Sequence, residues 1–264
     1  MLRDVQALTF AMGPVHRDSE GRRLRARLAE RLGARLGIPV EVVSTASYAE
    51  LATLMSDGSA QLGWMPPAIF ARLEAGGLHL LAAVERSLGG YRGVLFAPAD
   101  GAVKSLEDLR GKRVAWVDRD SCAGYLFVKL ALQQAGLDPA ELFASEHFEG
   151  SHGGVIRAVL RGDADVGATH AQTRPESDDV LLAGWHPYAG RDGMRALLVS
   201  PTIPPDVICA APGLDPEQLD ELRHALLSLH EGDVDDLLDE LFGGARLIGA
   251  KTTSYDPVRV AMQG

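Results

Sequence analysis

Apolar residues along the chain follow two spacings that alternate from end to end. Short continuous apolar runs, as in residues 5–12, 40–44 and 113–117, predict buried strands. Between them, apolar residues recur every three or four positions, which is typical of amphipathic helices. The clearest helix has leucines at 24, 28, 32 and 36, and ends at Gly37-Ile38-Pro39. Strands alternating with helices predict an α/β protein with mostly parallel sheets.

The same spacings predict the remaining elements. A Ser, Asp or Pro at the expected first turn supports several of the helices. The further helices are expected over residues 48–57, 67–75, 123–135, 215–230 and 233–242, and the further strands over residues 61–64, 78–85, 91–97, 166–169, 180–184, 194–199 and 207–210.

Two turns between a strand and a helix carry the candidate chemistry. The first spans residues 117–125 and the second residues 149–154, ahead of a periodic apolar run. The first turn of a helix presents N–H groups without an intrahelical acceptor, at the positive end of the helix dipole, and so favours an anion. In parallel sheets, ligands lie beyond the carboxyl ends of strands. We therefore expect both turns to converge on one anionic ligand.

The net charge of −10 and the pI near 5.3 argue against a nucleic-acid surface, which needs clustered Lys and Arg in excess. The one basic run lies in the first helix, between its leucines. We interpret these arginines as the solvated face of that helix, with a partner-binding face as the alternative. They are Arg22, Arg23, Arg25, Arg27, Arg31 and Arg35.

Two cysteines, Cys122 and Cys209, give neither a disulfide framework nor a CxxC metal motif, and no cofactor is expected. The first 15 residues hold no apolar signal-peptide core, and no run approaches the ~18 apolar residues of a membrane span. The sequence as written is therefore expected in the cytoplasm, without direct membrane insertion. If an export signal has been removed, the periplasm or cell surface is expected instead.

Several motifs occur in one order along nearly the whole chain. They are Leu-Gly-Trp-Met-Pro-Pro at 62–67, Leu-Glu-Asp-Leu-Arg-Gly-Lys-Arg-Val at 106–114, the turn at 120–125, Phe-Glu-Gly-Ser-His at 148–152, Ile-Pro-Pro-Asp at 203–206 and Tyr-Asp-Pro at 255–257. In this order the chain resembles the phosphonate/phosphite/phosphate-type substrate-binding proteins of ABC transporters. The resemblance implies a type II periplasmic-binding-protein fold, with two α/β lobes, two crossover strands and a ligand clamped between the lobes by hinge closure. Lobe 1 would comprise residues 1–93 and 198–264, and lobe 2 residues 94–197.

The resemblance also implies the site. In the family, hydroxyls of the turn matching Ser121 to Gly124 hold the phosphonate oxygens, helped by a histidine at the position of His152. This chain departs at Cys122 and Ala123, which supply no strong hydroxyl donor. We therefore expect a small anionic solute, either phosphonate- or phosphate-like or bearing a carboxylate. The candidate ligand-binding residues are Tyr48, Trp64, Pro66, Tyr91, Ser121, Cys122, Ala123, Gly124, His152, Thr169, His170 and Asp206, and Gln172 lies near a ligand-selecting position.

Each candidate also has a structural interpretation. Ser121 serves equally as a helix cap, and Trp64 as a core residue at the end of a strand. A thiol at a helix N-terminus near a histidine suits a nucleophile, so the alternative function is a biosynthetic enzyme on the same scaffold that uses Cys122 and His152. The simpler interpretation makes Cys122 a small filler. An exported protein would have an ABC transporter permease as partner, and a cytoplasmic one a sensor or carrier role.

Overall fold

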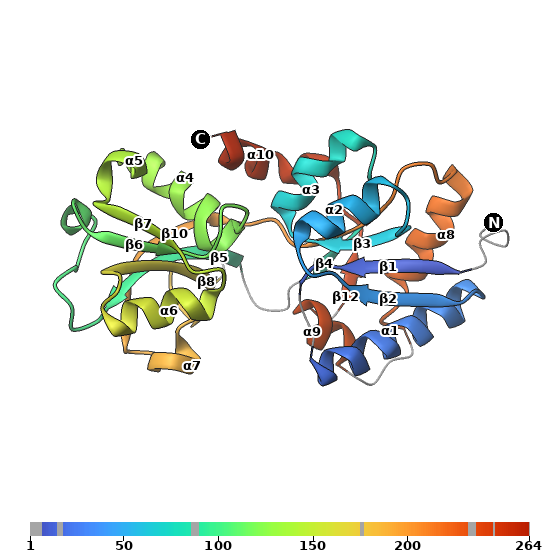
Figure 1. Cartoon of the computed structure of the whole chain (residues 1–264), viewed down its shortest axis with the longest axis horizontal. Helices are drawn as coiled ribbons and strands as arrows, with labels where there is room; N and C mark the ends of the chain where they lie inside the picture. Colours follow the sequence, from blue (N-terminus) through green and yellow to red (C-terminus); the bar gives the residue numbers. More distant parts are fainter. Residues whose placement is uncertain are drawn as a thin grey trace. The chain divides into compact units, whose positions relative to one another are not determined.

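A computed structural model describes residues 7–14, 18–85, 90–174, 177–231, 236–244 and 246–263. The chain divides into two compact units (Figure 1). Unit 1 comprises residues 1–87 and 205–255, and unit 2 comprises residues 88–204 and 256–264. The expected lobe boundaries, at 93/94 and 197/198, fall a few residues inside unit 2. The last segment also packs with unit 2, although the sequence placed it in lobe 1.

Unit 1 is built on a six-stranded mixed sheet. Its strands lie in the order β12 (Arg246–Ile248), β4 (His79–Glu85), β11 (Val207–Ala210), β3 (Leu62–Met65), β1 (Leu8–Met12) and β2 (Val40–Ser44). The first two predicted strands and the helix between them form a β-α-β unit, because β1 pairs in parallel with β2, and β1 also pairs in parallel with β3. Strand β11 runs antiparallel to both β3 and β4, and β12 antiparallel to β4. Residues 5 and 6 of the first predicted strand lie outside the described residues.

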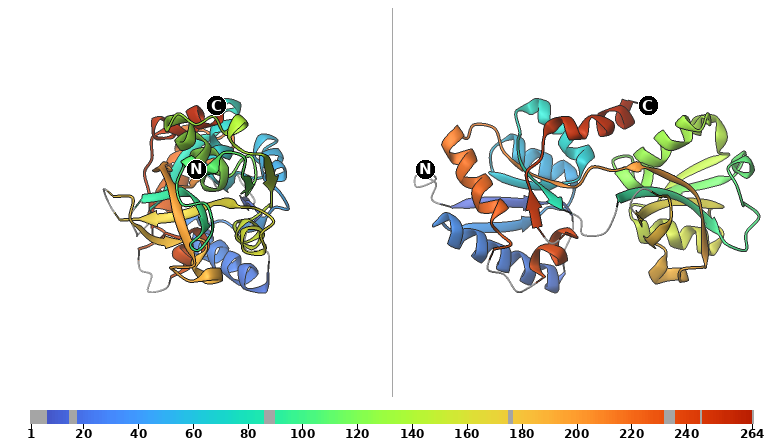
Figure 2. Two further views of the ribbon diagram at one scale, coloured as in Figure 1. Left: turned by 90° about the vertical axis from the view of Figure 1, so that its left-hand side faces the viewer. Right: turned by 180° about the vertical axis from the view of Figure 1, so that it is seen from behind.

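The helix α1 (Ser19–Leu36) matches its leucine spacing, since all four leucines are buried against the core. Asp18 caps its start by accepting the N–H of Gly21 at 2.8 Å, and Gly37 ends it in the left-handed conformation, with φ of 69°. Unit 1 also holds α2 (Tyr48–Ser56), α3 (Pro67–Leu73), α8 (Pro216–Leu227) and α9 (Leu237–Phe242). Figure 2 (right) shows α1, α8 and α9 from behind, and α8 and α9 each pack against α1. Among the described residues, no helix has the length and apolar character that a bilayer crossing requires.

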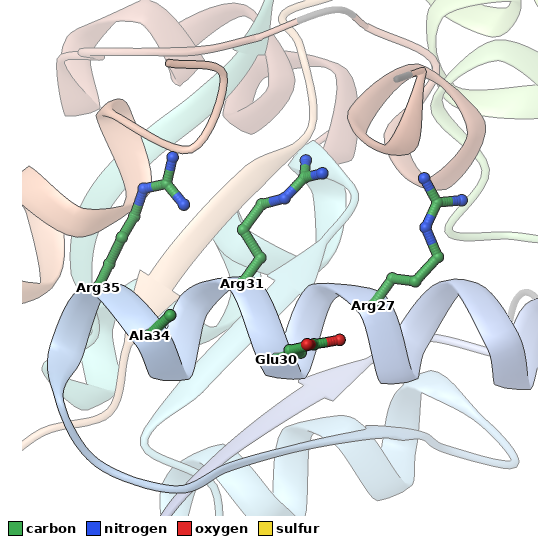
Figure 3. A pocket seen from close by; sticks show the side chains of 5 residues that line it. All are labelled: Arg27, Glu30, Arg31, Ala34 and Arg35. Atoms are coloured by element: carbon green, nitrogen blue, oxygen red, sulfur yellow. The ribbon is translucent and has the colours of Figure 1, made fainter. Parts of the chain in front are cut away.

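At least two arginines on the arginine face of α1 contact other segments of unit 1. Arg27, Arg31 and Arg35 point the same way from successive turns, beside a shallow groove (Figure 3). The Arg35 guanidinium donates to the carbonyl oxygens of Ser228 at 3.0 Å and Glu231 at 2.9 Å, just past the end of α8. Arg27 lies 3.9 Å from the Glu240 carboxylate of α9. A cation at the carbonyl end of a helix is stabilising, so Arg35 contributes to the packing of α8 on α1.

Unit 2 holds the second mixed sheet. Its strands lie in the order β10 (Met194–Thr202), β5 (Gly90–Pro98), β8 (Val166–Thr173), β6 (Arg113–Trp116) and β7 (Ser145–Phe148), with β9 (Val180–Ala183) on the end of β8. Strand β6 pairs in parallel with β7 and β8, whereas β5 runs antiparallel to β8 and β10. The prediction of mostly parallel sheets is therefore wrong for both units. Strands at the crossings between units, such as β5 and β11, pair antiparallel because no crossover helix turns the chain before them.

Two glycines set the distance between the unit 2 sheet and its helices. A Cβ on Gly93 would lie 2.7 Å from the carbonyl oxygen of Ala123, so the π-helix η4 (Cys122–Leu126) and α4 (Phe127–Gln134) can approach one face. A Cβ on Gly167 would lie 2.6 Å from Val155 Cγ1 of α6 (His152–Arg161), on the opposite face (Figure 1). The remaining helices of unit 2 are α5 (Pro139–Leu142), α7 (His186–Ala189) and α10 (Asp256–Gln263), which packs on α4.

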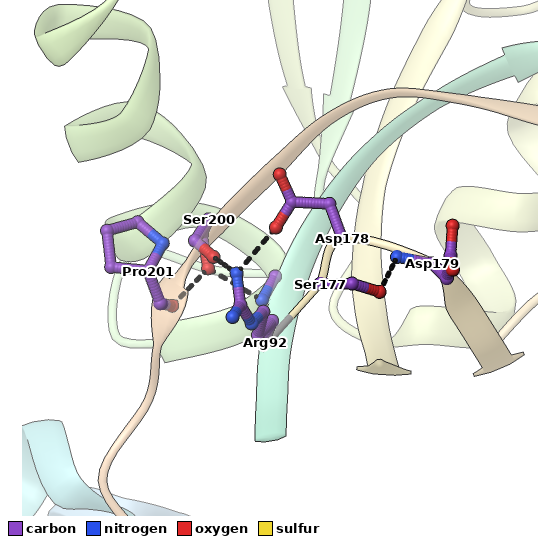
Figure 4. Close-up of polar contacts among 7 residues, drawn as sticks. Arg92, Ser177, Asp178, Asp179, Ser200 and Pro201 are labelled. Atoms are coloured by element: carbon purple, nitrogen blue, oxygen red, sulfur yellow. Dashed lines mark hydrogen bonds and ion pairs between the residues drawn. The ribbon is translucent and has the colours of Figure 1, made fainter. Parts of the chain in front are cut away.

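Polar contacts hold β5 and β10 together near their ends (Figure 4). The pairing is irregular between Val199 and Thr202, and there the buried Ser200 hydroxyl oxygen accepts the N–H of Gly93 at 2.9 Å. Arg92 Nη1 donates to Asp178 Oδ1 at 2.8 Å and to the Ser200 carbonyl oxygen at 3.3 Å. The Ser200 hydroxyl thus replaces a backbone hydrogen bond where the pairing of β5 with β10 is irregular.

Candidate functional site

The two predicted turns lie side by side in unit 2. Strands β6 and β7 are parallel, so their carboxyl ends meet at one edge of the sheet. Just past these ends, the carbonyl oxygen of Trp116 accepts the N–H of Glu149 at 2.9 Å, and that of Val117 accepts the N–H of Gly150 at 2.8 Å. The structure therefore brings together two segments that are about 30 residues apart in the sequence.

Both turns use the same Ser-x-x-Gly cap. Ser121 Oγ accepts the N–H of Gly124 at 3.0 Å, and Ser151 Oγ accepts the N–H of Gly154 at 3.1 Å. A hydroxyl that accepts one N–H still has its own proton to donate, so the capping and ligand-binding interpretations of Ser121 are compatible. A Cβ on Gly124 would lie 2.3 Å from Val117 Cγ2, which explains the glycine at this third helical position.

The first turn opens as a π-helix, which the sequence did not predict. The N–H of Leu126 donates to the carbonyl oxygen of Ser121 at 3.0 Å, and the N–H of Phe127 donates to that of Cys122. Single π turns within α-helices often occur at functional sites. The side chains of Cys122 and Ala123 are only 6% and 2% exposed. In this arrangement the turn presents the Ser121 hydroxyl and backbone groups rather than further side-chain donors.

His152 is the first residue of α6 and lies against β8. Its Nδ1 is 3.0 Å from the Oγ1 of Thr169, and its ring lies 4.7 Å from the ring of His170, nearly perpendicular to it. Tyr91 of β5 stacks on His170, with ring centroids 6.1 Å apart. Burial, with a smaller contribution from His170, lowers the pKa of His152 to about 3. His152 is therefore a neutral hydrogen-bonding group at physiological pH.

Two charged residues flank the first turn. Asp118 Oδ1 accepts the N–H of Asp120 at 2.8 Å, which shapes the turn, and burial raises the pKa of the Asp118 carboxyl. The Arg119 guanidinium lies 4.7 Å above the ring of Phe148, which is 37% exposed at the end of β7. Arg119 therefore places a cation beside the two turns, on an aromatic ring, and no carboxylate among the described residues pairs with it.

Four of the candidate residues belong to unit 1, and their part in binding stays a prediction. The ring of Tyr48 lies against Gly13, where a Cβ would be 2.4 Å from Tyr48 Cε1. Trp64 is 6% exposed within the unit 1 core, where its ring lies 6.1 Å from that of Phe242. Pro66 caps α3 through its carbonyl oxygen, and the Asp206 carbonyl oxygen accepts the N–H of Val84 at 2.9 Å.

Buried polar side chains of unit 2 include two that the sequence did not mention, Arg92 and Thr173, and one that it placed near a ligand-selecting position, Gln172. Arg92 Nε, Gln172 Oε1 and Thr173 Oγ1 are buried without a hydrogen-bond partner among the described residues. Gln172 lies opposite Tyr91 in the ladder, so it shares a face of the sheet with Tyr91. The sequence signal for Arg92 was a charge inside a predicted buried strand, residues 91–97. Buried polar atoms of this kind normally bond to water or to a ligand.

Cys122 and Cys209 are both buried and are not joined by a disulfide. Cys122, the nucleophile of the enzyme alternative, is only 6% exposed in this structure. Within the described part of the chain, no three His, Cys, Asp or Glu side chains are placed to hold a metal ion. The groups that the two turns present are hydrogen-bond donors and helix dipoles.

The family model for the periplasmic phosphonate substrate-binding protein of ABC transporters matches residues 10–255. The chain belongs to this family. It is 25% identical over 277 residues to the phosphate-import protein PhnD of Mycolicibacterium smegmatis, covering 96% of this chain and 84% of that protein.

Two solved structures show the family fold. Protein XAC2383 of Xanthomonas citri, bound to ATP, has a TM-score of 0.77 at 21% identity and covers 98% of this chain and 97% of its own. PhnD1 of Prochlorococcus marinus, in complex with methylphosphonate, has a TM-score of 0.72 at 16% identity and covers 98% and 97%. The predicted type II periplasmic-binding-protein fold and the predicted family are both confirmed.

Proposed function

We propose that this chain binds a small oxyanion, either phosphonate- or phosphate-like or carboxylate-bearing, as the substrate-binding component of an ABC transporter. The observation that carries the proposal is the pair of Ser-x-x-Gly helix starts, held side by side by the Val117–Gly150 hydrogen bond. Two helix starts at one edge present N–H groups and two positive dipole ends to the same region. His152 adds a ring nitrogen next to them.

The charge of the solute follows from the charges of these groups. The turns themselves offer dipoles and hydroxyls, His152 is neutral, and Arg119 is a cation beside the first turn. Such a set favours a monoanion over a dianion, because a second charge would need a further full positive charge or several charge-assisted hydrogen bonds. We therefore place monoanionic phosphonates and carboxylates ahead of phosphate dianions.

Similar proteins support an oxyanion. The structure from Prochlorococcus marinus holds methylphosphonate, the one from Xanthomonas citri holds ATP, and the relative from Mycolicibacterium smegmatis is a phosphate-import protein. Each of these ligands or cargoes carries a phosphorus oxyanion. We further propose that ligand binding brings a closing hinge motion and that the closed form docks on a permease. That role requires export, and cell fractionation would decide between the cytoplasm and an exported location.

A thermal-shift screen of the purified chain tests the proposal. Methylphosphonate, phosphate, methanesulfonate and acetate are the probes, and ethylammonium, which carries no oxyanion, is the cationic control. We expect at least one anion to raise the melting temperature in a saturable way, with the ligand recovered unchanged by mass spectrometry. Conversion of the ligand would support the enzyme alternative, and stabilisation by ethylammonium alone would overturn the oxyanion proposal.

A further inference from the structure

The contact between Thr169 and His152 has a direction that the structure allows us to assign. Thr169 lies in the middle of β8 and is fully buried, so its hydroxyl does not reach a solute. Within the described residues, the one hydrogen bond of that hydroxyl is the 3.0 Å contact to His152 Nδ1. The sequence placed Thr169 among the ligand-binding residues. The structure instead puts it behind the histidine.

We infer that Thr169 is a positioning residue, whose hydroxyl donates to Nδ1 and thereby keeps the His152 proton on Nε2. A neutral imidazole carries one proton, so the contact can run in either direction. If Nδ1–H donated to the hydroxyl oxygen, the buried Thr169 O–H would have no acceptor. A buried donor without an acceptor costs free energy, whereas donation from the Thr169 hydroxyl to Nδ1 satisfies both groups.

The surrounding backbone holds the threonine in place. Gly184, just after β9, donates its N–H to the carbonyl oxygen of His170 at 3.0 Å. A Cβ on Gly184 would lie 2.4 Å from Thr169 Oγ1 and 3.1 Å from His170 Cε1. Only a glycine therefore lets β9 lie against both side chains. We assign Gly184 the role of keeping the Thr169 hydroxyl directed at Nδ1.

The functional consequence is that His152 presents a donor, Nε2–H, rather than a lone pair. This consequence rests on the proposed function, because the unprotonated oxygens of an oxyanion accept hydrogen bonds and need a donor such as Nε2–H opposite them. With Nε2–H fixed before binding, the chain does not have to select a tautomer when the solute arrives. A solute that offers a donor at the same place would instead meet another donor and bind less well.

Histidine ¹⁵N NMR of the ligand-free chain tests the tautomer without any ligand. The His152 signals are identified by their loss in the His152→Gln variant. We expect a protonated Nε2 and an unprotonated Nδ1 in the wild type and in Thr169→Ser, which keeps the hydroxyl. In Thr169→Val, which keeps the shape and removes the hydroxyl, the two tautomers should mix. A protonated Nδ1 in the wild type, or an unchanged tautomer in Thr169→Val, would overturn the inference.

Methylphosphonate titration gives the second readout. Thr169→Val should weaken binding about five-fold, the value of one neutral hydrogen bond, while Thr169→Ser stays near the wild type. Gly184→Ala should also weaken methylphosphonate binding, and it takes the place of Thr169→Val in this test if Thr169→Val does not fold. A probe that fails to bind the wild type would count against the proposed function, whereas the NMR result alone decides the role of Thr169.

Discussion

The two helix starts of unit 2 share a cap and differ in the residues that come after it. Ser121 and Ser151 each accept the N–H of a glycine three residues on, at 3.0 and 3.1 Å. The first continues into a buried π turn whose next two side chains are hidden, and the second continues into α6 with His152 at its first position. The same local sequence thus gives a backbone-lined turn in one place and a side-chain donor in the other.

Glycine at the third position should distinguish the two turns most strongly. Gly124→Ala places a Cβ 2.3 Å from Val117 Cγ2 in a buried turn, and we expect a loss of about 3 kcal/mol in unfolding free energy. A Cβ on residue 154 would lie 2.8 Å from the Glu149 carbonyl oxygen, in a less buried place. Because alanine also favours the helix there, we expect Gly154→Ala to lower the unfolding free energy by only about 1 kcal/mol. Urea denaturation measures both. Equal losses would show that the first turn is not the more tightly packed one.

The two serines form a matched pair for ligand binding. Ser121→Ala and Ser151→Ala each remove one cap, so each should cost about 1 kcal/mol of stability. On affinity they should differ, with a loss of roughly 10- to 100-fold for Ser121→Ala and less than about three-fold for Ser151→Ala, because we assign the ligand hydroxyl to Ser121. Calorimetric titration with the best anion from the screen provides the comparison. Equal losses would remove the distinction between cap and ligand group.

Restoring hydroxyls to the first turn tests whether its departure from the family pattern limits affinity. We expect Cys122→Thr with Ala123→Ser to strengthen methylphosphonate binding about ten-fold, through added charge-assisted hydrogen bonds. We expect the affinity gain of only one hydrogen bond, because the side chains at both positions are buried. The single variant Cys122→Ser, with Ala123 unchanged, should give a smaller gain in affinity. No gain in either variant would place the anion away from these side chains.

The second turn should make the stability of the chain depend on pH through His152. The pKa of His152 falls from its ordinary value of 6.5 to about 3 in the folded chain, so between these values the unfolded chain holds a proton that the folded chain does not. Stability is therefore lost as the pH falls through this window. His152→Gln should reduce the loss between pH 7 and pH 5 by about 1 kcal/mol, since the ring is only half-buried. Parallel pH slopes for variant and wild type would contradict the lowered pKa.

Local signals in the sequence predicted much of this structure. The leucine spacing indicated α1, Asp215 with Pro216 indicated the start of α8, and glycine-rich turns indicated both helix starts. The π turn was not predictable, because it depends on how closely η4 packs on β5 and β8. The contact of His152 with Thr169 joins residues on different elements, so no local pattern encodes it. The same holds for α10, which looks like any short amphipathic helix until its packing on α4 is known.

Binding of an oxyanion at the paired turns is the central claim, and backbone amide NMR tests it most directly. The measurement is a titration of the ¹⁵N-labelled chain with methylphosphonate, following the amide signals of residues 121–124 and 151–154 together with those of the remaining chain. We predict that the largest saturable shifts in unit 2 fall in these two segments. Saturable shifts in unit 2 that leave both segments unchanged would contradict the claim.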